Sequence, residues 1–237
     1  MNNELYDFNY FCKILDSFSI HISDDSSVIK QLNKRWYTSI SECNIDYSIY
    51  NEDDYFIDLW NCWKFYSSKY IKLIHKNVFL SDTISSYNSL CDLGCGFGFS
   101  TVQLKRLFPS LDIYGTNIYE SKQYAIASFL GNTENFNIYQ SVQNNTNIIF
   151  ASEYFEHFYE PIDHLVNILN IANPSILIVA NSFGAESIGH FKEYKYCNNI
   201  MNPLMTSKRF NKTIIEHGFN KIDTGFWNNR PMVYLRG

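Results

Sequence analysis

A run of glycines near the middle of the chain is the feature of the sequence that points most directly to chemistry. Residues 91–99 read C-D-L-G-C-G-F-G-F between an apolar run and a helical pattern, the context in which a glycine loop indicates ligand binding. Gly94 allows a sharp turn, Gly96 allows the backbone to approach a ligand closely, and Gly98 allows the next helix to lie near the strand. The dinucleotide pattern G-x-G-x-x-G fails because Phe99 stands at its third glycine, and the phosphate-loop pattern fails because no Lys-Ser or Lys-Thr follows.

A Glu-His pair after a later apolar run could carry proton chemistry. Glu156 and His157 follow the apolar residues 148–151, and Pro161 then opens a helical pattern. With an ordinary pKa of about 6.5, a histidine at the carboxyl end of a strand can act as a general base near neutral pH. A structural role, in which the pair caps the helix and orders the loop, explains the same residues equally well. His190, in a loop after another apolar run, is the rival candidate for the base.

These residues need elements to position them, and the sequence from about residue 87 alternates between strand and helix patterns. Short apolar runs predict strands over 89–93, 111–115, 136–140, 147–151 and 175–180. Helical spacing predicts helices over 101–108, over 120–130, from 161, and from a cap at Thr206 or Ser207 to a stop at Gly218, with a final hairpin of 220–226 and 232–236. Two histidines on these helices, His164 and His217, are expected at the surface. The alternation indicates an α/β fold with a doubly wound, mostly parallel sheet, which binds ligands at the carboxyl ends of its strands.

The first third of the chain has a different pattern. Apolar residues at helical spacing predict two amphipathic helices, within 5–18 and 56–74, joined by a polar and poorly periodic stretch over 19–52. In the second of these helices Trp60, Trp63 and Tyr66 fit either a buried stripe or the wall of a pocket. The change of pattern divides the chain into an N-terminal helical cap, residues 1–84, and a second domain, residues 85–237.

Composition excludes several classes of protein. Of the 237 residues, 46% are hydrophobic and 18% are charged, which is too apolar for a disordered chain. The net charge of −5 gives no electrostatic reason to bind a phosphate backbone. The longest aliphatic run, 176–180, is far shorter than a membrane span, and the first residues lack the basic and apolar regions of a signal peptide. No C-x-x-C pair or His cluster has metal-ligand spacing, so we expect a cytoplasmic protein with free cysteines, no metal and no membrane segment.

The D-x-G-x-G-x-G pattern of 92–98 resembles that of the class I S-adenosylmethionine-dependent methyltransferases, and the resemblance extends from about residue 87 to the last residue. It implies S-adenosylmethionine as cofactor and a Rossmann-like fold with a seven-stranded, mostly parallel sheet and a C-terminal β-hairpin, to which residues 1–84 add the helical cap. In this superfamily the glycine loop packs against the methionine half of the cofactor, and the acid before it, here Asp92, helps orient the ammonium group. The residues that the resemblance assigns to the cofactor follow the first four predicted strands: Asp92, Gly94, Cys95, Gly96, Gly98, Asn117, Ile118, Gln140, Ser141, Ser152 and Glu153.

Two positions that are usually acidic in the superfamily hold other residues here. Asn117 stands where an acid usually binds the ribose hydroxyls, and its amide can bond a hydroxyl, although a charged acceptor would bond it more strongly. Gln140 and Ser141 stand where an Asp usually contacts adenine, and they either bond the adenine amino group or belong to a plain surface loop. Residues 155–158, which contain the Glu-His pair, resemble the cyclopropane fatty-acid synthase branch, where this pair helps hold a bicarbonate base. The candidate catalytic residues are therefore His157, Glu156 and His190.

The sequence as a whole predicts transfer of a methyl group from S-adenosylmethionine to oxygen or nitrogen of a small polar acceptor, such as a sugar, a nucleotide or another metabolite. One alternative is a nucleic-acid methyltransferase, although the Pro-Pro motif that grips a flipped base and the Pro-Cys nucleophile of cytosine enzymes are absent, and Lys and Arg are scattered. The other alternative is a non-catalytic protein that keeps the fold, which the missing ribose and adenine acids suggest.

Overall fold

A seven-stranded sheet forms the centre of the molecule. The structure is a computed structural model that describes residues 7–23, 25 and 27–237, and within these residues the strand order is β3-β2-β1-β4-β5-β9-β8. The strands are β1 Ser89–Asp92, β2 Asp112–Thr116, β3 Ile138–Tyr139, β4 Ile148–Ser152, β5 Ile176–Ala180, β8 Phe219–Ile222 and β9 Met232–Arg236. Strands β1 to β5 are parallel, whereas β9 is antiparallel to both β5 and β8. The predicted mostly parallel sheet with a C-terminal hairpin is confirmed, and its strand order reverses between β1 and β4, where such sheets bind ligands.

Apolar side chains of the strands are buried on both faces of this sheet. In β4, Ile149 and Ala151 belong to one buried cluster, whereas Ile148 and Phe150 belong to another. Successive side chains of a strand point to opposite faces, so the two clusters lie on the two sides of the sheet. All five residues of β5 are buried as well. A continuous apolar run is what a parallel strand between two layers of helices requires.

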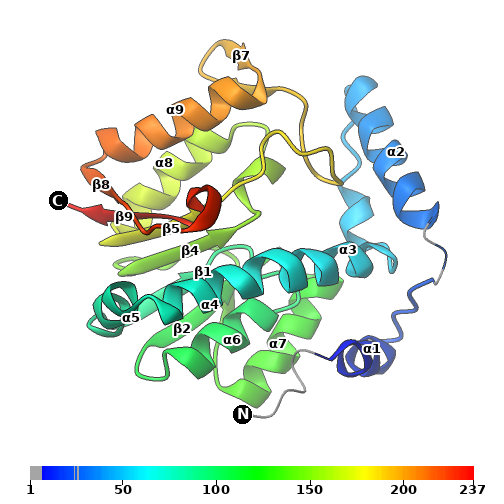
Figure 1. The fold of residues 1–237 in the computed structure, drawn as a ribbon. Helices are drawn as coiled ribbons and strands as arrows, with labels where there is room; N and C mark the ends of the chain where they lie inside the picture. Colours follow the sequence, from blue (N-terminus) through cyan, green and yellow to red (C-terminus); the bar gives the residue numbers. More distant parts are fainter. Residues whose placement is uncertain (1–6, 24, 26) are drawn as a thin grey trace.

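Helices form the layers on the two faces. In Figure 1, α8 (Pro161–Ala172) and α9 (Pro203–Glu216) lie on one side, α4 (Ser68–Lys76), α6 (Phe99–Leu107) and α7 (Lys122–Glu134) lie on the other, and α2 (Ser27–Ser41) and α3 (Tyr55–Cys62) lie at one end. Pro161 stands in the first turn of α8, as predicted. The prediction that Thr206 or Ser207 caps α9 is wrong, because Pro203 already occupies the first turn and the side chain of Asn202 accepts from the backbone N–H of Met205 at 2.9 Å.

The stretch predicted to be irregular, 19–52, contains α2. This helix buries only Leu32, Trp36 and Ser39, so its apolar stripe is too narrow to read from the sequence. Its stability comes from tertiary contact: Trp36 is fully buried, and its indole N–H donates to the backbone carbonyl of His190 at 2.8 Å. Three other elements were not predicted either: α5 (Val78–Ser85) and the small hairpin of β6 (Tyr194–Tyr196) with β7 (Asn199–Met201).

The aromatic residues of the N-terminal helices are core residues in the main. Trp60 and Trp63 are buried in a cluster with Phe11 of α1 (Phe8–Ser17) and Phe99 of α6, whereas Tyr66 is 48% exposed. The N-terminal helices therefore share buried clusters with the sheet region. In the described parts of the chain, every helix is too short or too polar to cross a bilayer.

Candidate active site

The loop between β1 and α6 has the backbone that its glycines allow. Gly94, Gly96 and Gly98 have φ angles of +69°, +55° and +95°, the left-handed region that side chains disfavour. Two hydrogen bonds from the loop to the end of β2 hold it in place: the N–H of Gly94 donates to Oγ1 of Thr116 at 2.9 Å, and the N–H of Cys95 donates to the Thr116 carbonyl at 3.0 Å. These bonds tie the loop to the carboxyl end of the neighbouring strand.

The space around the three glycines differs. A Cβ at Gly94 would lie 2.1 Å from the ring of Tyr154, and one at Gly98 would lie 3.2 Å from the Cα of Ala127 in α7. Around Gly96 the nearest atom to such a Cβ is Cδ2 of Leu59, at 3.8 Å. Packing thus requires glycine at the first and third positions, whereas Gly96 presents its backbone to open space.

That open space belongs to a cavity of about 460 Å³ at the carboxyl ends of the strands. This volume lies within the range of small-molecule sites. Residues at or just after the ends of β1, β2 and β3 line one part of it: Gly94, Gly96, Thr116, Asn117, Ile118 and Gln140. Ring-bearing residues of the cap and of the segment after β4 line the other part: Tyr47, Tyr50, Tyr55, Tyr154, His157, Phe158, Tyr159 and His164.

Asp92 lies beneath the glycine loop and is not among the residues that line the cavity. One of its carboxylate oxygens accepts from the hydroxyls of Ser100 and Thr101, both at 2.6 Å, and the side chain is 2% exposed. Burial raises the pKa of Asp92 to about 6, against the lowering effect of the two hydroxyls. The contacts show that Asp92 joins the end of β1 to the first turn of α6, and a direct contact with a cofactor ammonium stays a prediction.

Asn117 lines the cavity with its side chain already engaged. Its amide N–H donates to the carbonyl of Gly96 at 2.5 Å, and its amide oxygen accepts from the N–H of Ile118 at 2.8 Å. The donor bond to Gly96 is one that an aspartate could not make. The asparagine therefore ties the glycine loop to the end of β2, a structural reason for an amide where the superfamily usually has an acid.

The remaining predicted cofactor residues divide between the cavity and its surroundings. Ile118, Gln140 and Glu153 line the cavity. The others lie outside the lining: Cys95 packs against Gly115, Ser152 shares a hydroxyl–hydroxyl hydrogen bond of 2.9 Å with Ser67, Gly98 packs against α7, and Ser141 is exposed with its carbonyl bonded to the side chain of Gln143.

The structure brings two of the predicted catalytic residues, His157 and His190, together. Their rings are 4.9 Å apart and nearly perpendicular, and Nδ1 of His157 lies 3.1 Å from the hydroxyl of Tyr50. Burial lowers the pKa of His157 to about 3, so its imidazole is neutral at physiological pH. His190 donates from Nδ1 to the carbonyl of Ala185 at 3.0 Å, and burial lowers its pKa as well. Of the two, His157 lines the cavity.

Glu156 does not share a partner with His157. It is fully buried, and one carboxyl oxygen accepts from the backbone N–H of Ser182 at 2.5 Å. Its other oxygen, Oε2, and the Oε1 of Glu153 are buried without a donor partner. Burial raises the pKa of Glu156 well above its usual value, and the charge of Glu153 raises it further. Burial raises the pKa of Glu153 as well, so both carboxyl groups are harder to ionise than free ones, and Glu156 is the more strongly shifted of the two.

Several cavity residues have no signal in the sequence. Tyr50 and Tyr55 come from the cap, more than ninety positions from His157 along the chain, in a stretch whose pattern is not helical. His164, which was expected at the surface, lines the cavity: its Nε2 lies 2.9 Å from the hydroxyl of Tyr154, and its ring stacks on Phe158 at 3.9 Å. Burial lowers the pKa of His164 to about 4, so it too is neutral.

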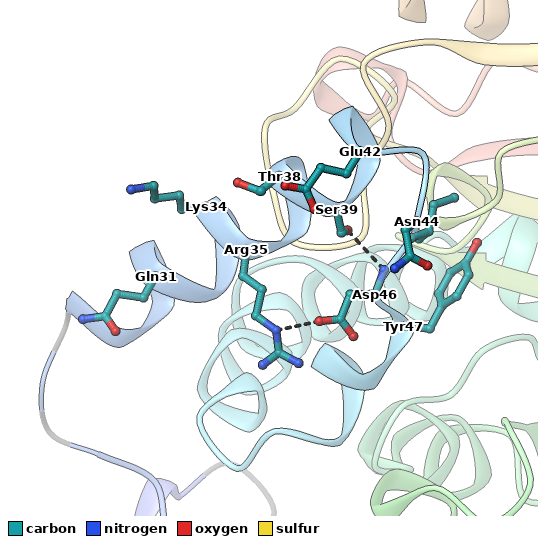
Figure 2. A pocket seen from close by; sticks show the side chains of 10 residues that line it. Gln31, Lys34, Arg35, Thr38, Ser39, Glu42, Asn44, Asp46 and Tyr47 are labelled. Carbon is teal, nitrogen blue, oxygen red and sulfur yellow. Dashed lines mark hydrogen bonds and ion pairs between the residues drawn. The ribbon is translucent and has the colours of Figure 1, made fainter.

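A second hollow of about 580 Å³ lies on the cap, over α2 and the turn after it. Figure 2 shows its charged side chains directed at one another or at solvent: Nε of Arg35 bonds Asp46 at 2.6 Å, while Lys34 extends away. Arg35 also pairs with Glu52 at 2.5 Å. Internal pairing leaves this surface less suited to a ligand than the cavity at the strand ends.

Comparison with known proteins shows which solved structures have a similar fold. No family model and no curated protein sequence matches the chain. An S-adenosylmethionine-dependent methyltransferase from Clostridium acetobutylicum aligns with 70% of this chain and 92% of its own, at 9% identity and a TM-score of 0.50. The StiE O-MT aligns with 66% of this chain at 16% identity and a TM-score of 0.47. The plantazolicin methyltransferase BpumL, solved with a pentazolic desmethylPZN analog and SAH, aligns with 67% of this chain at 18% identity and a TM-score of 0.46. The chain spans 53% and 62% of the lengths of these last two. The chain has the fold of the class I methyltransferases, as the glycine pattern predicted.

Proposed function

We propose that this protein is an S-adenosylmethionine-dependent methyltransferase that acts on oxygen or nitrogen of a small molecule. The observation that carries the proposal is the glycine loop, whose left-handed Gly96 faces open space in a cavity at the point where the strand order reverses. A loop of this kind allows a ligand to lie directly against the backbone.

The residues present fit the cofactor. Gly94 and Gly96 offer backbone for the methionine half, and Asn117 and Ile118 follow β2 where the ribose would be held. Gln140, at the end of β3, offers an amide to the adenine. When bound, S-adenosylmethionine supplies a methyl group on a positively charged sulfur, ready for attack by a nucleophile.

The chain's own contribution to the reaction is to hold the acceptor in line. His157 reaches the cavity with a ring that the hydroxyl of Tyr50 orients, and as a neutral imidazole it can bond a hydroxyl or amine. The lowered pKa makes His157 a weak base, so its role is better suited to orienting the acceptor than to removing a proton from it. Positioning alone can supply a large share of the rate of a transfer reaction. His190 would act through the contact of its ring with that of His157, and Glu156 by tying the segment after β4 to the N–H of Ser182.

A crystal structure of the protein soaked with S-adenosylhomocysteine tests the proposal. We expect density along the cavity, with the adenine beside Gln140, the sulfur on the side of His157 and the backbone of Gly96 in contact with the ligand. Density elsewhere, or an empty cavity together with no binding in solution at millimolar ligand, would overturn it and favour a non-catalytic protein that keeps the fold.

A further inference from the structure

The charge of the cavity wall restricts what can bind beside the cofactor. Among the described residues that line the cavity there is no lysine or arginine. Burial holds the pKa of His157 at about 3 and that of His164 at about 4, so neither ring is cationic near neutral pH. An anionic group of an acceptor, placed among the tyrosines and histidines of this wall, would lose its hydration without meeting a cationic side chain, which is costly.

The acidic residue of the described cavity wall is Glu153, which lies close to the buried carboxyl group of Glu156. Arg230 attracts Glu153, but its guanidinium bonds the hydroxyl of Ser182 and the carbonyl of Asn181, and Arg230 is not part of the cavity lining.

The backbone at Glu153 is strained in a way that supports a role for its side chain. Its φ angle is +51°, the left-handed region that a glutamate disfavours, and its N–H donates to the carbonyl of Ala180 at 2.7 Å. A non-glycine residue held there costs on the order of 1–3 kcal/mol, and such positions cluster at ligand sites. An acid therefore stands at the wall of the cavity in spite of this backbone cost.

Aromatic rings form the rest of this part of the wall. Tyr50, Tyr55 and Tyr154 are held by packing: Tyr50 and Tyr55 meet edge to face at 5.2 Å, and the ring of Tyr154 lies against Gly94. Burial raises the pKa of each of these three phenols, so they stay uncharged. Such rings favour flat apolar ligands through stacking, and cationic ones through their negative faces.

We propose that the acceptor of this methyltransferase is an uncharged or cationic molecule that carries an aromatic ring, bound among the tyrosines with its donor or ammonium group toward Glu153, and that phosphorylated molecules and nucleic acid are excluded. That the bound molecule is a methyl acceptor rests on the proposed function, whereas the binding preference follows from the cavity wall. The preference restricts the range of acceptors that the sequence allows, which includes sugars, nucleotides and other metabolites.

Three small probes of similar size test this preference. Tyramine, tyrosol and 4-hydroxyphenylacetate each carry a short side chain on a hydroxyphenyl ring, and the side chain ends in an ammonium, a hydroxyl and a carboxylate, respectively. Ligand-observed NMR titrations on the full chain, with and without saturating S-adenosylhomocysteine, give the three affinities. We expect tyramine to bind more tightly than the carboxylate by about tenfold or more, with tyrosol between them.

A matched pair of variants identifies the group responsible. Glu153→Gln removes the acidic group from the cavity wall and should bring the affinities for tyramine and tyrosol close together. Glu160→Gln, which changes an exposed glutamate paired with Lys195 outside the cavity, should leave the wild-type order intact. If Glu153→Gln does not fold, the ratio of tyramine to carboxylate on the wild type still decides.

The outcomes separate the inference from the proposed function. Equal or tighter binding of the carboxylate, or no binding of any probe at millimolar concentration, overturns the inference even if S-adenosylhomocysteine binds. Failure of S-adenosylhomocysteine to bind overturns the proposed function, while the order of the three probes without it still judges the charge preference of the cavity.

Discussion

Alanine at Gly189 should destabilise the protein far more than alanine at a glycine of the same backbone conformation elsewhere. Gly189 has φ +86°, and a Cβ there would lie 2.2 Å from both the hydroxyl of Tyr50 and Nδ1 of His157. Gly218, after α9, has φ +85° and nothing within 4 Å of such a Cβ. The pair therefore separates backbone strain from crowding at the candidate catalytic group.

The magnitudes follow from these contacts. A left-handed alanine costs about 1–2 kcal/mol at either site. Gly189→Ala also breaks the hydrogen bond between Tyr50 and His157, worth about 1 kcal/mol, and displaces packed rings at about 1–3 kcal/mol. For a chain of this size each kcal/mol lowers Tm by about 2–4 °C, so Gly218→Ala should lower Tm by about 2–8 °C and Gly189→Ala by a further ~4–16 °C.

Thermal unfolding followed by circular dichroism measures both variants. The double variant Gly189→Ala with Tyr50→Phe supplies a further check, because without the phenol oxygen one of the two close contacts is gone and the extra cost should shrink. Equal loss of Tm in Gly189→Ala and Gly218→Ala would refute the arrangement of Tyr50, His157 and Gly189 described above.

Three further predictions address other parts of the site. The unfolded chain protonates His157 below about pH 6.5 and the folded chain does not, so this group costs the wild type about 1.5 kcal/mol at pH 5 relative to pH 6.5. The Tm of His157→Gln should therefore fall less on acidification, and parallel Tm curves for the two proteins would contradict the lowered pKa. Asn117→Asp loses the hydrogen-bond donor to the Gly96 carbonyl, so the Tm of the ligand-free protein should drop by about 2–4 °C. An unchanged Tm would show that this hydrogen bond does not stabilise the glycine loop. Trp36→Phe leaves the buried carbonyl of His190 without its donor, a loss of about 1–3 kcal/mol that urea unfolding would detect, and wild-type stability would show that the cap is not held there.

The sheet and the glycine loop could be predicted from the sequence because their signals are local. Apolar runs such as 176–180 fit strands covered on both faces, and the spacing of Gly94, Gly96 and Gly98 matches a turn that needs left-handed backbone. The amphipathic helices of the cap were visible for the same reason, whereas α2 was not, since most of its surface is polar and tertiary contact holds it.

The wall of the cavity could not be predicted because distant segments build it. Tyr50 reaches His157 across 107 positions, a contact that no local pattern encodes. His164 sits on a helix where spacing alone suggests the surface, yet the loop after β4 folds over it through Tyr154 and Phe158. The hydrogen-bond partners of polar side chains could not be predicted either. Asp92 and Asn117 have the predicted positions, but Asp92 accepts from two hydroxyls of α6 and Asn117 donates to the glycine loop.

Titration calorimetry with S-adenosylhomocysteine on the wild type and on Gly96→Val tests the central claim most directly. Valine at Gly96 would place its side chain in the open space over the loop, and Gly225→Val is the matched control, since Gly225 has φ +65° and nothing within 4 Å of a Cβ. We predict that the wild type and folded Gly225→Val bind with similar affinity and that folded Gly96→Val does not bind. Unchanged affinity in a folded Gly96→Val protein, or no binding by the wild type, would contradict the assignment of this cavity to the methyl donor.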